Sequence, residues 1–71
     1  MKNEELAKKV GKRIVHLREN KGWSQSDLAR ACMKDRQSIE RIENGKTNPT
    51  LFTFHEIATA LEVSLAELFK I

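Results

Sequence analysis

Residues 23–49 read WSQSDLARACMKDRQSIERIENGKTNP, and this stretch decides the fold. Ser24 is suited to cap a helix, and Asp27 stands three residues later, as in a capping box. Asp35 can begin another helix in the same way, and the glycine of Asn44-Gly45 can end it. Because only about three residues separate the two helices, they can cross steeply as a helix-turn-helix. Their predicted buried faces are Leu28, Ala29 and Cys32 in the first and Ile39 and Ile42 in the second.

Apolar residues at helical spacing continue on both sides of this stretch. Upstream, an amphipathic helix that ends near Lys21-Gly22 is predicted from four residues: Leu6, Val10, Ile14 and Leu17. Downstream, a loop at residues 46–49 leads into a fourth helix that begins at Thr50. This helix is expected to turn five residues inward: Leu51, Phe54, Ile57, Ala58 and Leu61.

A fifth helix is predicted at the end of the chain. Ser64 and Glu67 have the spacing of a full capping box, and Leu65, Leu68 and Phe69 would pack inward. No segment alternates between apolar and polar residues with the period of two that a strand requires. The pattern therefore predicts an all-α fold of five short helices, in which the second and third form the helix-turn-helix.

The composition fits one small domain with a slight positive charge. The 71 residues include 13 Lys and Arg against 10 Asp and Glu, a formal net charge of +3. No apolar run approaches the roughly 20 residues of a membrane-spanning helix, and the charged N-terminus is unlike a signal peptide. We therefore expect a single cytoplasmic domain over residues 1–71, with a core at about residues 6–69 and no membrane partner.

Few residues suggest catalysis or metal binding. Cys32 is the single cysteine, so no internal disulfide is expected, and its place beside Leu28 indicates a small core residue. His16 and His55 lie far apart without an evident ligand set. The chain has no plausible set of nucleophile, base and orienting residue, and no glycine-rich phosphate loop. We therefore expect no enzymatic activity, no metal and no cofactor.

The side of the third helix that points away from Ile39 and Ile42 is polar. With about 100° per residue, four side chains fall within about 50° of the direction opposite to the buried one: Gln37, Glu40, Arg41 and Asn44. Arginine donates twice to guanine and glutamine pairs its amide with adenine, so this side is suited to reading base edges. Arg36 and Gln37 also lie in the first turn, which in a recognition helix points into the major groove. A solvated helix face explains these residues, taken alone, equally well.

Polar residues around this side are placed to bind DNA phosphates. Gln25 begins the preceding helix, where free N–H groups and the positive dipole end favour an anion. Lys46, Thr47 and Asn48 follow the third helix, and Thr50 opens the fourth with free N–H groups. These donors flank the polar side and are able to hold both edges of a groove.

Four stretches of the chain match one known pattern. They are Leu17-Arg18, WSQSDLA at 23–29, QSIERIENGKTNP at 37–49 and ATALEVSLAELF at 58–69. Together, over roughly residues 10–69, they resemble the Cro and phage-repressor type (XRE) helix-turn-helix family. The resemblance implies a five-helix, lambda-repressor-like DNA-binding domain that binds an operator, usually as a homodimer.

The resemblance also implies roles for individual residues. Three match base-reading positions: Arg36, Gln37 and Arg41. Gln25 matches a phosphate or base contact, and Asn44 and Lys46 match contacts with the DNA backbone. Arg18 and Glu43 match a buried ion pair that ties the first helix to the recognition helix.

Two positions depart from the family pattern, and a third is unusual. Met33 stands where the turn usually has glycine, which predicts a strained φ or a different helix ending. Lys34 replaces an apolar residue and is a further candidate for a phosphate contact, with a plain surface lysine as the alternative. Glu40 is an acid on the DNA-facing side, and we expect it to hold Arg36 at i,i+4 instead of accepting from a cytosine.

The leading hypothesis is a sequence-specific regulator of transcription that binds double-stranded DNA, a repressor acting as a homodimer on an inverted repeat. The alternative is a helical interaction module, or an antitoxin or controller subunit, whose main partner is another protein such as a toxin. Phe52 points away from the apolar stripe of its helix and is a candidate interface residue. The end of the chain, residues 68–71, is able either to form a dimer contact or to close the core.

Overall fold

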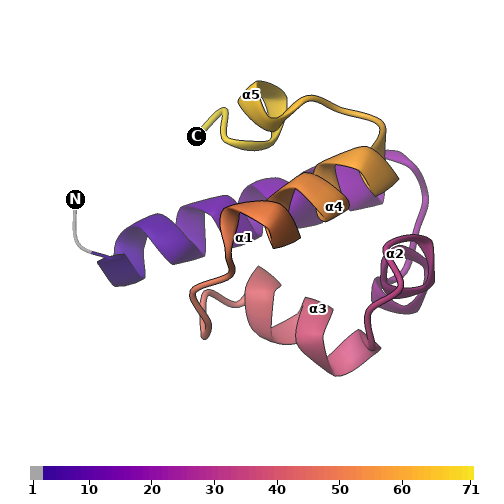
Figure 1. Cartoon of the computed structure of the whole chain (residues 1–71), viewed down its shortest axis with the longest axis horizontal. Helices are drawn as coiled ribbons and strands as arrows, with labels where there is room; N and C mark the ends of the chain where they lie inside the picture. The colour runs from indigo at the N-terminus through magenta and orange to yellow at the C-terminus, as the bar shows by residue number, and fades with distance from the viewer. Residues whose placement is uncertain (1–2) are drawn as a thin grey trace.

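Five α-helices follow one another in residues 3–71, the part of the chain that the computed structural model describes (Figure 1). They are α1 (Asn3–Asn20), α2 (Gln25–Ala31), α3 (Arg36–Glu43), α4 (Leu51–Leu61) and α5 (Leu65–Leu68). No strand occurs within these residues, so the predicted all-α fold is confirmed. In Figure 1, α3 lies at one edge of the molecule and α5 at the opposite edge, with α1 and α4 between them.

The core takes one completely buried side chain from each helix. Ile14, Leu28, Ile39, Ile57 and Leu68 are all 0% exposed. Full burial of an aliphatic side chain stabilises a fold by about 1.5–3 kcal/mol, so each helix is anchored by its own core residue. Further apolar side chains pack around this cluster while partly exposed: Leu17, Trp23, Phe54, Ala60, Val63, Leu65 and Phe69.

Two residues of the predicted apolar stripes lie outside the core. Leu6 is 44% exposed and Leu51 is 67% exposed, so the prediction that they point inward is wrong. Leu6 lies in the N-terminal part of α1, which extends beyond the other helices in Figure 1. Leu51 is the first residue of α4 and lies at the edge of the packed region. The buried core therefore begins at Val10 and not near residue 6.

Side chains cap the starts of α2 and α3 as predicted. The Ser24 hydroxyl accepts from the Asp27 N–H at 3.1 Å, and the Asp27 carboxylate accepts from the Ser24 N–H at 2.8 Å, a complete capping box. The Asp35 carboxylate accepts from the Ser38 N–H at 2.7 Å. These bonds from the backbone N–H groups of Ser24 and Ser38 lower the pKa of Asp27 and of Asp35 respectively.

The capping box predicted for α5 is only half formed. The Ser64 hydroxyl accepts from the Glu67 N–H at 3.1 Å, as expected. The Glu67 carboxylate does not return to Ser64, because it pairs with the Arg13 guanidinium at 3.1 Å. Arg13 also donates to the Glu67 carbonyl at 2.9 Å, so the side chain that was expected to cap α5 instead joins it to α1.

Four helices end with a residue at positive φ immediately beyond the last turn. At α1 and α3 this residue is glycine, whereas at α2 and α4 it is Met33 with a φ of 57° and Glu62 with a φ of 62°. At Met33 the backbone forms the Schellman pattern, with the Lys34 N–H bonded to the Ala29 carbonyl at 2.8 Å. A side chain at this φ costs about 1–2 kcal/mol. Of the two alternatives expected at Met33, a strained φ and a different helix ending, the structure has the positive φ.

A glycine lets α1 and the end of α3 approach closely. A Cβ at Gly11 would lie 2.3 Å from the Glu43 carbonyl oxygen and 2.7 Å from the Ile42 carbonyl oxygen. Because real Cβ atoms do not come this close, only glycine fits at this position. The contact fixes the C-terminal turn of α3 against the middle of α1 and so sets which side of α3 faces outward.

Candidate DNA-binding surface

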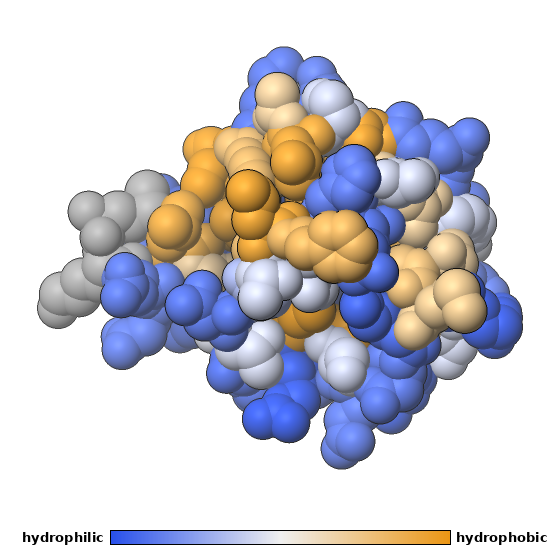
Figure 2. Space-filling model, viewed as in Figure 1, coloured by the Kyte–Doolittle hydropathy of each residue, from blue (hydrophilic) through white to orange (hydrophobic). Residues whose placement is uncertain are grey.

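The helix α3 buries its apolar side and leaves its polar side open to solvent. Ile39 is 0% and Ile42 is 8% exposed, whereas Arg36, Gln37 and Arg41 are all exposed. Neither the Gln37 amide nor the Arg41 guanidinium makes a hydrogen bond within residues 3–71. The surface around α3, at the lower edge of Figure 2, is largely hydrophilic. Gln37 and Arg41 therefore lie on the free side of this helix, and Arg36 is exposed at its first turn.

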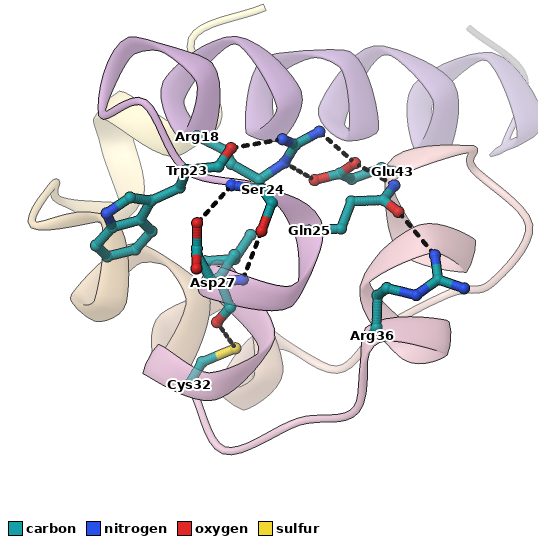
Figure 3. A network of polar contacts seen from close by, with 9 residues as sticks. Arg18, Trp23, Ser24, Gln25, Asp27, Cys32, Arg36 and Glu43 are labelled. Carbon is teal, nitrogen blue, oxygen red and sulfur yellow. Dashed lines mark hydrogen bonds and ion pairs between the residues drawn. The ribbon is translucent and has the colours of Figure 1, made fainter.

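A buried ion pair lies behind this surface and joins α1 to α3 (Figure 3). The Arg18 guanidinium donates to the Glu43 carboxylate from Nε at 2.7 Å and from Nη2 at 3.1 Å. Its Nη1 donates to the Trp23 carbonyl at 2.8 Å. The hydrogen bond to Glu43 raises the pKa of Arg18. The structure thus brings together the two residues that the family resemblance pairs, at 9% and 5% exposure.

Gln25 connects this ion pair to the first turn of α3 (Figure 3). Its Nε2 donates to Glu43 Oε1 at 2.9 Å, and its Oε1 accepts from Arg36 Nη1 at 3.2 Å. Because the carboxylate accepts from the amide nitrogen, the carbonyl oxygen must face away from it, toward Arg36. The Gln25 side chain therefore holds a candidate base reader. Direct contact of Gln25 with a phosphate stays a prediction.

Besides Gln25, four of the predicted contacts with the DNA backbone have partners within the protein. The Lys34 ammonium donates to the Glu56 carboxylate at 2.8 Å, which joins the turn to α4 and raises the pKa of Lys34. The Asn44 amide donates to the Glu40 carboxylate at 2.7 Å. The Thr50 hydroxyl accepts from the Thr53 N–H at 3.1 Å and caps α4, and the Lys46 ammonium lies 3.8 Å from the Glu40 carboxylate. The other two candidates, the half-buried Thr47 and the exposed Asn48, lie in the loop between α3 and α4.

Glu40 does not hold Arg36, so that prediction is wrong. Its Oε1 accepts from Asn44 and lies 3.8 Å from the Lys46 ammonium. Arg36 turns instead toward the Gln25 carbonyl, which Glu43 fixes in place. Glu40 therefore neutralises part of the positive charge next to the loop and does not pair with Arg36.

Sequence reasoning missed two partners of these residues. Glu56, the partner of Lys34, lies 22 residues further along the chain, and no local spacing connects them. The Trp23 carbonyl, an acceptor for Arg18, is a main-chain atom and leaves no signature in the side-chain pattern. Both contacts depend on how the helices pack.

Residues 3–71 contain neither a metal-binding cluster nor a membrane-spanning helix. No group of three His, Cys, Asp or Glu side chains is placed to hold a metal ion there. No helix in that part of the chain has the length and apolar character needed to cross a bilayer.

The fold and this surface are those of a helix-turn-helix protein, and comparison with known proteins agrees. The helix-turn-helix family model HTH_3 matches residues 14–68. The chain belongs to this family. The family match, together with relatives described as transcriptional regulators, makes the chain a DNA-binding transcriptional regulator.

Three similar proteins illustrate the range of the family. The chain is 36% identical over 64 residues to the uncharacterized HTH-type transcriptional regulator y4dJ of Sinorhizobium fredii, and the match covers 90% of this chain and 83% of y4dJ. It is 39% identical over 49 residues to the antitoxin HipB of Escherichia coli, covering 69% of this chain and 56% of HipB. The crystal structure of the restriction-modification controller C.AhdI from Aeromonas hydrophila matches with a TM-score of 0.90 at 34% identity, covering 96% of this chain and 99% of the controller.

Proposed function

We propose that the chain represses transcription by binding an inverted-repeat operator as a homodimer, with α3 in the major groove of each half-site. The observation that carries this proposal is the open side of α3, where Gln37 and Arg41 have no partner within residues 3–71. Arginine and glutamine supply the paired hydrogen bonds that distinguish guanine and adenine. Binding to chromosomal DNA in a bacterial cell would locate the protein in the cytoplasm.

Selection of bound sites from random duplexes tests this function. We expect an inverted repeat whose half-sites are centred about 34–36 Å apart. Gln37→Ala and Arg41→Ala should each cost about 1–3 kcal/mol and relax the preference at one base position, whereas Lys46→Ala should weaken all sequences alike. An unchanged preferred sequence in the Gln37→Ala, Arg41→Ala double variant would contradict this assignment of the base readers.

An apolar surface beside the DNA-binding surface supports the homodimer. A groove of about 580 Å³ opens there, and its apolar lining includes Leu6, Val10, Pro49, Phe54, Phe69 and Ile71. Leu51 and Phe52, each 67% exposed, follow Pro49 in the chain. Figure 2 shows the corresponding apolar area, extending across the front of the molecule toward the C-terminus. A stable interface buries about 800 Å² of accessible surface on each partner. This area is roughly a sixth of the 4714 Å² of accessible surface on this chain.

Sedimentation of the free protein tests the dimer. Phe52→Ser should shift the protein toward monomer and weaken operator binding, because it removes an exposed aromatic anchor from the apolar surface. Met33→Ser is the matched control, since Met33 is 92% exposed but lies in the turn between α2 and α3. Equal dimerisation of the two variants would exclude Phe52 from the interface.

The relation to HipB favours a second candidate function, that of an antitoxin. In this case a partner protein such as a toxin would occupy the apolar surface. A free protein that stays monomeric, and that recovers no repeated half-site in the selection, would favour this function over the dimeric repressor.

A further inference from the structure

A second group of positive charges lies on α1 and the end of the chain, outside the DNA-binding surface described above. Lys9, Lys12, Arg13 and Lys70 line a surface depression of about 280 Å³, together with Ile71. The stretch from Lys8 to Arg13 contains four cations and no acid. The group therefore combines two segments that are far apart in the sequence.

Three of these cations lack an acidic partner. Lys9, Lys12 and Lys70 are exposed, and among residues 3–71 no carboxylate lies within 4.0 Å of their ammonium groups. Arg13 differs, because it pairs with Glu67 at 3.1 Å. The other charged group on this side of α1 is Glu5, one helical turn before Lys9. Counted over side chains, four cations against two carboxylates leave this surface positive.

This surface faces away from α3. Gly11 marks the side of α1 that touches α3, since a Cβ there would meet the Glu43 carbonyl. Lys9 and Arg13 each lie two residues from Gly11 and therefore about 160° around the helix from it. In Figure 1 the C-terminus also lies on the side of α1 away from α3. A straight duplex held by α3 is therefore out of reach of Lys9, and Lys12, about 100° around the helix from Gly11, lies at the side of α1.

We propose that this surface, formed by Lys9, Lys12, Arg13 and Lys70, binds the phosphate backbone of a second DNA duplex, so that one protein is able to bridge two segments. Lysine supplies sequence-independent phosphate contacts, which is the chemistry that this surface offers. Protein interfaces are depleted in lysine and enriched in aromatic residues, and Ile71 is the one apolar residue that lines this depression. The composition therefore favours DNA over an acidic protein.

Capture of a second duplex tests the proposal. The full chain is bound to an immobilised duplex that carries its selected operator, and a labelled duplex of unrelated sequence is added at increasing salt. We expect the wild type to capture the label, with an affinity that falls steeply with salt. Lys9→Gln/Lys12→Gln should weaken capture and lower the slope of log K against log salt by about 2, since each lost phosphate contact removes about 0.9. Lys9→Arg/Lys12→Arg keeps the charge and should retain capture.

Affinity for the isolated operator duplex is measured in parallel and should change less than about twofold in Lys9→Gln/Lys12→Gln, since these residues lie outside the α3 surface. An equal loss on the isolated operator would show that the lysines contact the operator itself and would overturn the proposal. If Lys9→Gln/Lys12→Gln still captures the second duplex as well as the wild type does, another surface, such as the α3 of a second subunit, binds that duplex. This outcome would also overturn the proposal. Binding of polyglutamate in place of the second duplex would identify an acidic protein as the partner. Failure of the wild type to select any operator would instead contradict the proposed function.

Discussion

The Arg18 guanidinium and the Glu43 carboxylate form two hydrogen bonds, at 2.7 and 3.1 Å, that join α1 to the last residue of α3. Because both groups are buried, the loss of their hydration offsets much of their mutual attraction. Their main consequence is orientation. The pair holds α3 against α1, and through Glu43 it also fixes the amide of Gln25.

Arg18→Ala should lower the free energy of unfolding by about 3–5 kcal/mol, because it leaves the Glu43 carboxylate buried without its cation. Urea denaturation measures this change. Arg18→Met combined with Glu43→Leu should recover much of the loss, since the double variant buries no charge. Unchanged stability in Arg18→Ala would show that water reaches Glu43 and that the pair does not hold α3.

Gly11→Ala should destabilise the protein more than Gly22→Ala. A Cβ at Gly11 would lie 2.3 Å from a backbone oxygen, whereas a Cβ at Gly22 would meet nothing within 4 Å. Gly22 has a φ of 72°, so alanine there costs about 1–2 kcal/mol through backbone strain alone. Gly11→Ala must in addition push α1 and α3 apart. Denaturation midpoints in the reverse order would contradict the close approach of these helices.

Met33→Gly should raise the free energy of unfolding by about 1 kcal/mol, because it relieves a side chain held at a positive φ. Little packing is lost, since Met33 is 92% exposed. Met33→Ala keeps the Cβ and serves as the control, with stability close to that of the wild type. A gain in Met33→Ala equal to that in Met33→Gly would indicate that the exposed side chain, and not the backbone, is unfavourable.

Local sequence signals predicted the five helices and most of their caps correctly. Ser24, Asp35 and Thr50 all cap the helices that follow them, and Gly22 and Gly45 lie beyond the ends of α1 and α3 as expected. Each of these caps and helix ends depends on residues within one turn of one another, so the local sequence is sufficient to predict them. The apolar spacing also identified the five residues that anchor the core.

Contacts between helices were harder to predict, because they depend on how the helices dock. Glu67 has the spacing of a cap, but docking of α5 on α1 brings Arg13 to it. Arg36 has Glu40 at i+4, but the approach of α2 and α3 brings the Gln25 carbonyl closer. The exposure of Leu51 has the same origin, since a helical stripe does not reveal where the neighbouring helices stop.

Asp35 should stabilise the protein most at neutral pH and progressively less in acid. The Ser38 N–H lowers the pKa of this carboxyl from its ordinary value of 3.8. The stabilisation is therefore complete above pH 3.8 and is lost as the pH falls through the lower pKa of the folded state. Asp35→Asn keeps an acceptor at the cap but cannot ionise. Urea denaturation from pH 7 to pH 2 should show the wild type more stable at neutral pH, with the difference narrowing below pH 4. A constant difference would exclude the Asp35 charge as its source.

Gln25→Ala should relax the same position of the operator as Arg36→Ala, because Arg36 then loses the carbonyl that holds it at 3.2 Å. Arg36→Ala should cost about 1–3 kcal/mol of discrimination there, and the double variant should lose no more than Arg36→Ala alone, since the two residues act as a unit. Selection of sites followed by binding titrations measures these preferences. Gln37→Ala is the control, with a loss at another position that adds to that of Gln25→Ala. If Gln25→Ala instead weakens all sequences alike and lowers the salt slope by about 1, Gln25 binds a phosphate directly and does not position Arg36.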